Sequence, residues 1–221
     1  MLFYDNKLAP NPLVVRLFIM ERGGLELDVQ SVDIFNTEQR RLAYRTQVNK
    51  RGEIPALRLD DGTVITESVA ICKFLDEVAA GGHSLFGSTP TEKATTLMWL
   101  RRMDIDIVQP LSSWFRNGEE TIDFYRGHRI PDPSAKVIEK VRINQALNQL
   151  DDELEGKHFL CGDRFSAADV LLYGMTQPFL DGTAPWVNAP GRLNVAAWFD
   201  RMGSREASQK AIAGFGNHVS V

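Results

Sequence analysis

Residues 51–77 read RGEIPALRLDDGTVITESVAICKFLDE and carry the most informative fold signals of this chain. Residues 56–59 alternate in the manner of a strand, and Pro55 stands where a paired strand would supply a backbone N–H. An X–Pro bond at this position is a candidate for the cis form. We expect it to turn the backbone of Ile54 outward and leave its amide and carbonyl free.

The same stretch predicts a hairpin followed by a helix. Asp61-Gly62 indicates a two-residue turn between residues 56–59 and 63–65. Glu67 and Ser68 then precede apolar residues at helical spacing. A helix N-terminus attracts a carboxylate, and the Glu67 carboxylate beside it can pair with an amine. The stretch therefore predicts a receptor for an extended peptide with an α-amino acid head.

Composition narrows the class of protein. The chain has 221 residues, enough for one large or two ordinary domains, and a formal net charge of −4, which does not favour nucleic acid as a partner. Apolar runs stay below the roughly 18 residues that a membrane helix needs, so we expect no membrane partner. Two distant cysteines and no secretory signal predict a cytoplasmic location. The four histidines are isolated, and we expect no metal site.

The chain divides into two parts of different character. Over residues 1–81 the signals follow the order βαβ, helix, ββα, which is a thioredoxin-like arrangement. Residues 82–90 read as a linker, and residues 91–221 read as an all-helical domain. The predicted fold class is thus α/β plus all-α, with a C-terminal helical bundle. We expect Pro110 to kink the first long helix and the tail after Lys210 to be loosely held.

Two helix starts carry clear signals. Asn11 before Pro12 predicts an asparagine cap with proline at the first helical position. Ser166 and Asp169 have the spacing of a capping box, which accounts for both residues structurally.

In their order and spacing, these elements resemble the cytosolic glutathione transferases (GSTs) over nearly the whole chain. The resemblance rests on Ile54-Pro55, on residues 67–71, on the change to helices near residue 90 and on residues 162–169. Residues 9–12, 57–68, 101–104 and 109–112 look most like a bacterial and fungal branch that resembles the second glutathione transferase of yeast. The resemblance implies a thioredoxin-like domain, a helical bundle and a homodimer.

The resemblance also implies a binding site for glutathione, used as a co-substrate. Ile54, before Pro55, would hold its cysteinyl backbone by β-augmentation. Glu67 and Ser68 would bind the γ-glutamyl amine and carboxylate. Further candidates are Arg40, Arg41 or Lys50 for the glycyl carboxylate, and Asp104 as an acidic residue that the partner of a dimer contributes.

Thiol activation departs from the family pattern. Most GSTs use a Tyr, Ser or Cys just after the first strand, and residues 5–11 contain none of these. Tyr4 alternates into the core, and we predict a packing role for it. Asn11, beside its role as a cap, remains a candidate N–H donor to sulfur. In the yeast-like branch a serine and a histidine on the kinked helix act through water. Ser112 matches that serine, whereas Arg116 replaces the histidine and can stabilise a thiolate but not act as a base.

Three functions follow, in order of preference. The first is conjugation of glutathione to a small, hydrophobic electrophile. The second is a glutathione-dependent disulfide reductase or peroxidase, which the missing hydroxyl and Asn11 motivate. The third is a non-catalytic binding module, which Ile54-Pro55 and Glu67-Ser68 disfavour because these elements of a peptide site are intact.

Overall fold

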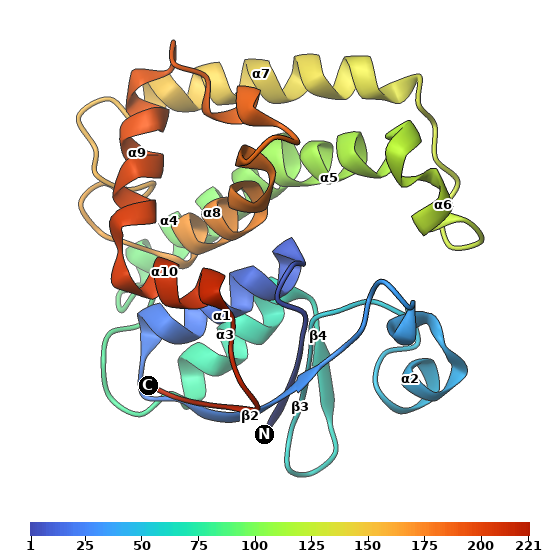
Figure 1. Ribbon diagram of the computed structural model, residues 1–221. Coiled ribbons are helices and arrows are strands. Elements are labelled where there is room, and N and C mark those ends of the chain that lie inside the picture. The colour runs from blue at the N-terminus through green and yellow to red at the C-terminus, as the bar shows by residue number, and fades with distance from the viewer. The chain divides into compact units, whose positions relative to one another are not determined.

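The computed structural model describes all 221 residues, which form two compact units (Figure 1). The first unit comprises Met1–Lys93 together with Met202–Val221, and the second comprises Ala94–Arg201. A mixed sheet lies in the first unit, and the second is built from helices. The predicted fold class is confirmed. The domain boundaries at residues 81 and 91 stay a prediction, although the last twenty residues join the first unit.

Five strands form the sheet of the first unit. They are β1 (Leu2–Asp5), β2 (Glu26–Ser31), β3 (Ala56–Arg58), β4 (Val64–Thr66) and β5 (His218–Ser220). Their order is β4-β3-β1-β2-β5; β1 and β2 are parallel, and the other three pairs are antiparallel. The prediction of a loosely held tail is wrong because β5 pairs with the otherwise open edge of β2 and buries Val219.

Three helices accompany this sheet: α1 (Pro10–Arg22), α3 (Ser68–Val78) and α10 (Glu206–Ala213). Two short helical segments, η1 (Glu38–Arg40) and α2 (Leu42–Gln47), connect β2 to β3. Helix α1 contacts both α3 and α10. Gly24 follows α1 at φ 67°, and a Cβ atom there would lie 2.0 Å from the carbonyl oxygen of Ala80. Only glycine fits this close approach between the ends of α1 and α3.

The hairpin between β3 and β4 differs from its prediction. Leu59 N–H donates to the Thr63 carbonyl (2.8 Å), which leaves three loop residues, 60–62, in place of two. Gly62 has φ 87°, as the last position of a three-residue hairpin loop requires. Asp61 Oδ1 accepts from Thr63 N–H at 2.8 Å, so the aspartate acts as a local turn residue.

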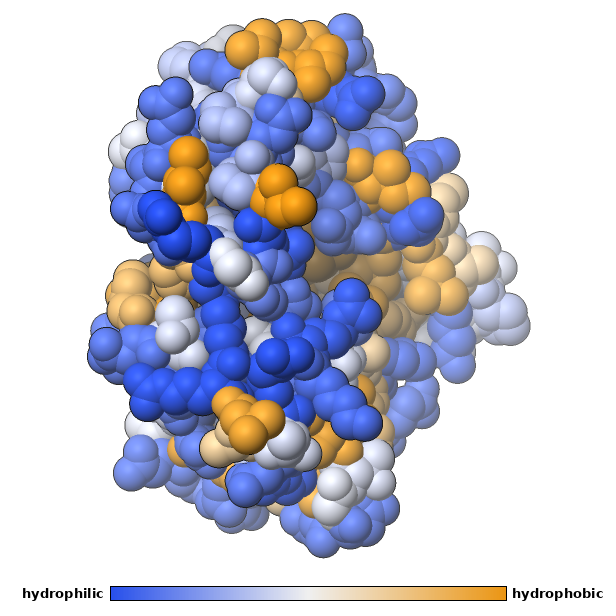
Figure 2. Space-filling view, turned by 90° about the vertical axis from the view of Figure 1, so that its right-hand side faces the viewer, coloured by the Kyte–Doolittle hydropathy of each residue, from blue (hydrophilic) through white to orange (hydrophobic).

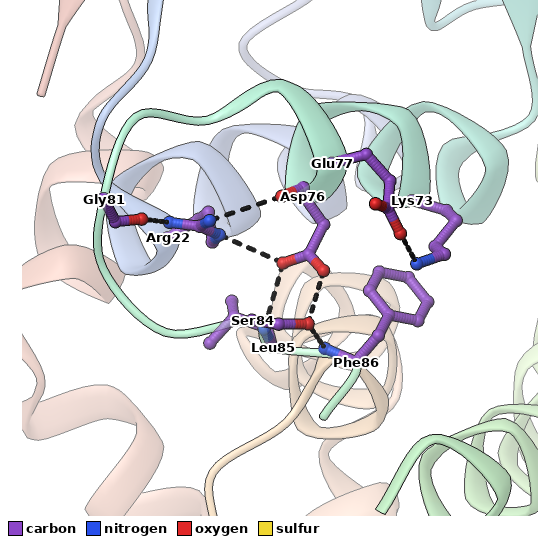
Figure 3. A network of polar contacts seen from close by, with 8 residues as sticks. All are labelled: Arg22, Lys73, Asp76, Glu77, Gly81, Ser84, Leu85 and Phe86. Atoms are coloured by element: carbon purple, nitrogen blue, oxygen red, sulfur yellow. Dashed lines mark hydrogen bonds and ion pairs between the residues drawn. The ribbon is translucent and has the colours of Figure 1, made fainter. Parts of the chain in front are cut away.

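A polar network ties the predicted linker to the first unit (Figure 3). Arg22 Nε, at the end of α1, donates to Asp76 Oδ1 on α3 at 3.0 Å, and Arg22 Nη1 donates to the Gly81 carbonyl at 2.7 Å. The Asp76 carboxylate also accepts from Ser84 Oγ at 2.5 Å and from Leu85 N–H at 3.0 Å. Because these groups are largely buried, the chain just after α3 is fixed to α1 and α3.

Helices make up the second unit. They are the greater part of α4 (Pro90–Met103), then η2 (Asp104–Val108), α5 (Gln109–Arg116), η3 (Glu119–Thr121), α6 (Ile122–Tyr125), α7 (Ala135–Glu153), α8 (Ala167–Leu180), η4 (Pro185–Asn188) and most of α9 (Leu193–Ser204). The segment η2 is a π-helical turn that ends two residues before Pro110, where the sequence predicts a kink; the kink itself stays a prediction. Proline has no N–H for the carbonyl one turn earlier, which disrupts the regular α-helical pattern.

The capping box at the start of α8 is confirmed. Ser166 N–H donates to Asp169 Oδ2 at 3.0 Å, and both side chains are fully buried. Asp169 Oδ1 also accepts from Leu160 N–H (2.9 Å) and Trp198 Nε1 (3.0 Å). Asp169 thus joins three segments of the second unit, which is a structural role.

None of the helices combines the length and the apolar composition that crossing a membrane requires. On the face in Figure 2, hydrophobic residues appear as separate patches among hydrophilic ones.

Candidate functional site

One end of the sheet gathers the predicted peptide-binding residues. Ala56 lies opposite Tyr4 on one side and opposite Thr66 on the other. Ile54, two residues before Ala56, therefore lies at the same end of the sheet as the loop after β1. Ser68, two residues after Thr66, begins α3 at this end as well. Chain segments far apart in sequence thus meet around Ile54.

The backbone of Ile54 is open to a ligand. The Ile54–Pro55 bond is cis, as expected, and neither backbone group of Ile54 forms a hydrogen bond within the chain. The preceding carbonyl, of Glu53, accepts from Tyr44 Oη at 3.2 Å and from Asn49 Nδ2 at 2.9 Å. These two donors fix the chain just before Ile54, so the free amide and carbonyl are held in place.

Glu67 has an unusual backbone conformation directly before α3. Its φ is 71° and its ψ is 122°, and its side chain forms no cap hydrogen bond. A side chain at such angles costs on the order of 1–3 kcal/mol, and such residues cluster at functional sites. The Glu67 side chain is exposed, whereas Ser68 is buried. The strained turn therefore leaves a carboxylate in solvent beside a buried hydroxyl.

The structure brings Ser68 and Asn11 together. Ser68 Oγ donates to the Asn11 carbonyl at 3.1 Å and lies 3.4 Å from Asn11 Oδ1. The first turns of α1 and α3 thus meet through these two residues. The Asn11 side chain is half-buried, and its Nδ2 forms no hydrogen bond within the chain. One amide donor at this end of the sheet is consequently unused.

The prediction that Asn11 caps α1 is wrong. The helix begins at Pro10, and Ala9 is the cap residue, without a side-chain hydrogen bond. Both prolines, Pro10 and Pro12, fit within the first turn because N–H groups there have no partner in the helix. The helix therefore starts two residues earlier than predicted, and the Asn11 side chain remains available.

Tyr4 lies in the core, which confirms its packing role. It is 2% exposed and belongs to a cluster with Val32, Tyr44 and Ala56. Its ring meets that of Tyr44 edge-to-face at 5.9 Å. Burial raises the pKa of the Tyr4 phenol, and the nearby Arg58 opposes that shift.

Three basic candidates lie around η1 and α2. Arg40 is half-buried, while Arg41 is exposed and its Nη2 donates to the Asn36 carbonyl at 3.0 Å. Lys50 is exposed, and its ammonium forms no hydrogen bond within the chain. Lys50 is thus an exposed cation whose ammonium is uncommitted, whereas the exposed Arg41 already has one partner.

Sequence reasoning missed Gln39 in the same segment. Its side chain is 5% exposed, and its Oε1 atom is buried without a hydrogen-bond partner. A buried acceptor left unpaired costs about 1–3 kcal/mol, so a water or a ligand group is expected beside it. No local sequence signal marks Gln39. Asn49 was also missed, although it precedes Gly52 in a polar loop, and asparagine is a typical turn residue in such a loop.

The remaining candidates belong to the second unit. Asp104 begins the π-helical turn, where its Oδ1 accepts from Gln109 Nε2 at 3.0 Å. Ser112 is buried on α5, and Arg116 ends that helix half-buried, without an ion pair. One turn apart on a helix, Ser112 and Arg116 have side chains on the same face. Their action on a thiol stays a prediction.

Comparison with known proteins agrees with this architecture. Residues 10–78 match the family description "Glutathione S-transferase, N-terminal domain", and residues 118–206 match "Glutathione S-transferase, C-terminal domain". The chain belongs to the glutathione S-transferase family. Glutathione is therefore the peptide that its family uses. No group of three or more His, Cys, Asp or Glu residues with the arrangement of a metal site is found in this GST.

The relatives of this GST include members of the predicted branch. Glutathione S-transferase 2 of Saccharomyces cerevisiae is 26% identical over 96% of this chain and 89% of its own length. A crystal structure of a Gtt2-class glutathione S-transferase from Vibrio parahaemolyticus has a TM-score of 0.80 at 27% identity, covering 96% of each chain. The crystal structure of yeast Gtt2 has a TM-score of 0.83 at 24% identity and covers 96% of this chain and all of that one. The predicted resemblance is confirmed.

Proposed function

We propose that this GST binds glutathione along Ile54 and activates its thiol for attack on a small, hydrophobic electrophile. The observation that carries the proposal is the open backbone of Ile54 at the end of the sheet where Ser68 and Asn11 meet. An extended cysteinyl residue can pair with Ile54 as a short antiparallel strand beside Pro55.

The two ends of glutathione find complementary groups. The exposed Glu67 carboxylate suits the γ-glutamyl amine, and Ser68 with the α3 N-terminus suits the neighbouring carboxylate. For the glycyl carboxylate we favour Lys50 or Arg41, since both are exposed cations near the chain that leads to Ile54.

The thiol must be activated without a hydroxyl in the loop after β1. Lowering a thiol pKa from about 8.5 to near neutrality by about 2 units requires about 3 kcal/mol. A hydrogen bond to a charged sulfur contributes about 1.5–3 kcal/mol, and a helix N-terminus contributes up to about 2 kcal/mol. We assign the donor to Asn11 at the start of α1. Ser112 and Arg116 are the second candidates, acting through a bound water.

We also propose a homodimer. Large apolar side chains are exposed along α4 and η2 (Leu97, Met98, Ile105) and along α7 (Val137, Ile138, Val141). Helix α7 contacts η2, so the two groups of apolar side chains lie on neighbouring elements of the second unit. If a second copy covered this region, the Asp104 carboxylate of one subunit could contact the glutathione bound to the other. Light scattering should give twice the chain mass, and Met98→Glu should yield monomers; a wild-type monomer at micromolar concentration would exclude the dimer.

Calorimetry and conjugation kinetics test the proposed function. Glutathione should bind with a micromolar to low-millimolar Kd, and turnover with a chlorodinitrobenzene-type substrate should be measurable. Ser68→Ala should raise the glutathione KM about tenfold through loss of one hydrogen bond to a charged group. Absence of glutathione binding would overturn the proposal and favour a non-catalytic module.

A second candidate is glutathione-dependent reduction of disulfides or peroxides, which the unused amide of Asn11 favours. Turnover with a mixed disulfide or a hydroperoxide would then exceed conjugation. Asn11→Ala should abolish that reduction, while Thr46→Ala on the exposed face of α2 should leave it unchanged. The cytoplasmic location stays a prediction.

A further inference from the structure

A fully buried arginine lies under the loop between β1 and α1. Arg16, on α1, has no exposed surface. Its guanidinium donates four hydrogen bonds: Nη1 to Asp5 Oδ1 (2.5 Å) and to the Asn6 carbonyl (2.9 Å), Nη2 to the Lys7 carbonyl (2.9 Å), and Nε to the Ala211 carbonyl (2.8 Å). One side chain therefore joins the end of β1, the following loop and helix α10.

Stability alone does not explain this arrangement. A buried ion pair often contributes no net stability, because desolvation of both charges offsets their attraction. Burial indeed raises the pKa of the Asp5 carboxyl and lowers that of Arg16, against the attraction between them. Three of the four bonds also go to main-chain carbonyls, which need no cation as a partner. A forked donor with fixed geometry is, however, well suited to hold a loop in one conformation.

The bonds of Arg16 determine which way the loop peptides face. In a planar trans peptide the C=O and N–H groups point in opposite directions. Because Arg16 binds the Asn6 and Lys7 carbonyls, the N–H groups of Lys7 and Leu8 face away from it. Leu8 N–H is used by Asn6 Oδ1 at 3.0 Å, whereas Lys7 N–H forms no hydrogen bond within the chain. The loop thus offers one main-chain donor just before α1.

We propose that Arg16 is a positioning residue for activation of the glutathione thiol, which it supports by orienting the β1–α1 loop so that Lys7 N–H and the first turn of α1 face the sulfur. This inference rests on the proposed function, because it needs glutathione in the site. It explains how a loop without hydroxyl or thiol groups stabilises a thiolate, and it assigns helix α10 a supporting role through Ala211.

The variant Arg16→Lys tests the proposal while conserving charge. Lysine offers a single donor point in place of the fork, so the loop carbonyls are no longer held together. The pKa of the bound glutathione thiol, followed by thiolate ultraviolet absorbance against pH, should rise by about one unit, and kcat at neutral pH should fall about threefold because the thiolate fraction falls. The Kd of S-methylglutathione, which has no thiol, should change less than about threefold because the Ile54 region is untouched.

Two further variants separate positioning from stability. Asp5→Asn removes the ion pair but keeps the guanidinium on the loop carbonyls, so it should lower the melting temperature without raising the thiol pKa. Lys7→Pro removes the free N–H from an exposed residue and should raise the thiol pKa while leaving Arg16 in place. If Arg16→Lys does not fold, the thiol pKa of Lys7→Pro alone tests the proposal.

A thiol pKa within about 0.3 units of the wild type in both Arg16→Lys and Lys7→Pro would overturn the proposal, as would an equal rise in Asp5→Asn. Failure of the proposed function gives a different result, because the wild type itself would then bind no glutathione.

Discussion

The segment 51–77 and the β1–α1 loop meet at one end of the sheet, yet different interactions hold them. In the segment 51–77, the hairpin loop and the cis Ile54–Pro55 bond follow from neighbouring residues, and Asn49 and Tyr44 support it from nearby in the chain. The β1–α1 loop depends on Arg16, whose bond to Ala211 spans 195 positions. The proposed peptide site is thus encoded locally, whereas the proposed environment of the thiol depends on the folded unit.

The largest effect is expected from breaking the long-range support. Arg16→Met leaves the Asp5 carboxylate buried and unpaired, which should lower the free energy of unfolding by about 3–5 kcal/mol. Urea unfolding measures this loss, and the double variant Asp5→Leu/Arg16→Met should recover part of it. A single-variant loss below about 1 kcal/mol would contradict the difference between the two regions.

Next in size is the local support of Ile54. Asn49→Ala removes two partly buried hydrogen bonds, to the Glu53 carbonyl and from Arg51 N–H, and should cost about 2 kcal/mol of stability. The Kd of glutathione should rise, while the pKa of the bound thiol stays at its wild-type value. Thr46→Ala serves as the control. A shift of the thiol pKa in Asn49→Ala would show that the two regions are not separable.

Asn11 and Ser68 link the two regions. Variants of these two residues should therefore separate effects on glutathione binding from effects on the rate of the reaction. Asn11→Ala should lower kcat about tenfold at unchanged glutathione KM, because it removes a donor to the thiolate. Ser68→Ala should do the reverse and raise KM at nearly constant kcat. Steady-state kinetics at varied glutathione concentrations check both, and the idea fails if the two variants alter the same parameter.

The smallest effect concerns the strained turn. Glu67→Gly removes both the carboxylate and the penalty of a side chain at φ 71°, whereas Glu67→Ala removes only the carboxylate. Both variants should raise the glutathione KM equally, but Glu67→Gly should be about 1 kcal/mol more stable than Glu67→Ala in thermal unfolding. Equal stability of the two variants would show that the turn stores no strain.

Features with local signals could be predicted from the amino-acid sequence. The order of elements, the position of the cis proline, the residues Glu67-Ser68 at the start of α3 and the capping box of Ser166 with Asp169 all follow from residues within a few positions of each other. Backbone sterics and capping hydrogen bonds act over such short distances, so residue types and their spacing are enough to predict them.

The proposed thiol side of the site depends on tertiary contacts. The start of α1 at Pro10 left the Asn11 side chain uncommitted, the tail became β5 on the edge of β2, and Gln39 was buried with an unpaired acceptor. Arg16 reads in the sequence as an ordinary helical cation, and its four partners become visible only when the end of β1, the loop and α10 converge. Burial and hydrogen bonding across such separations depend on the packing of the whole unit, which no local pattern specifies.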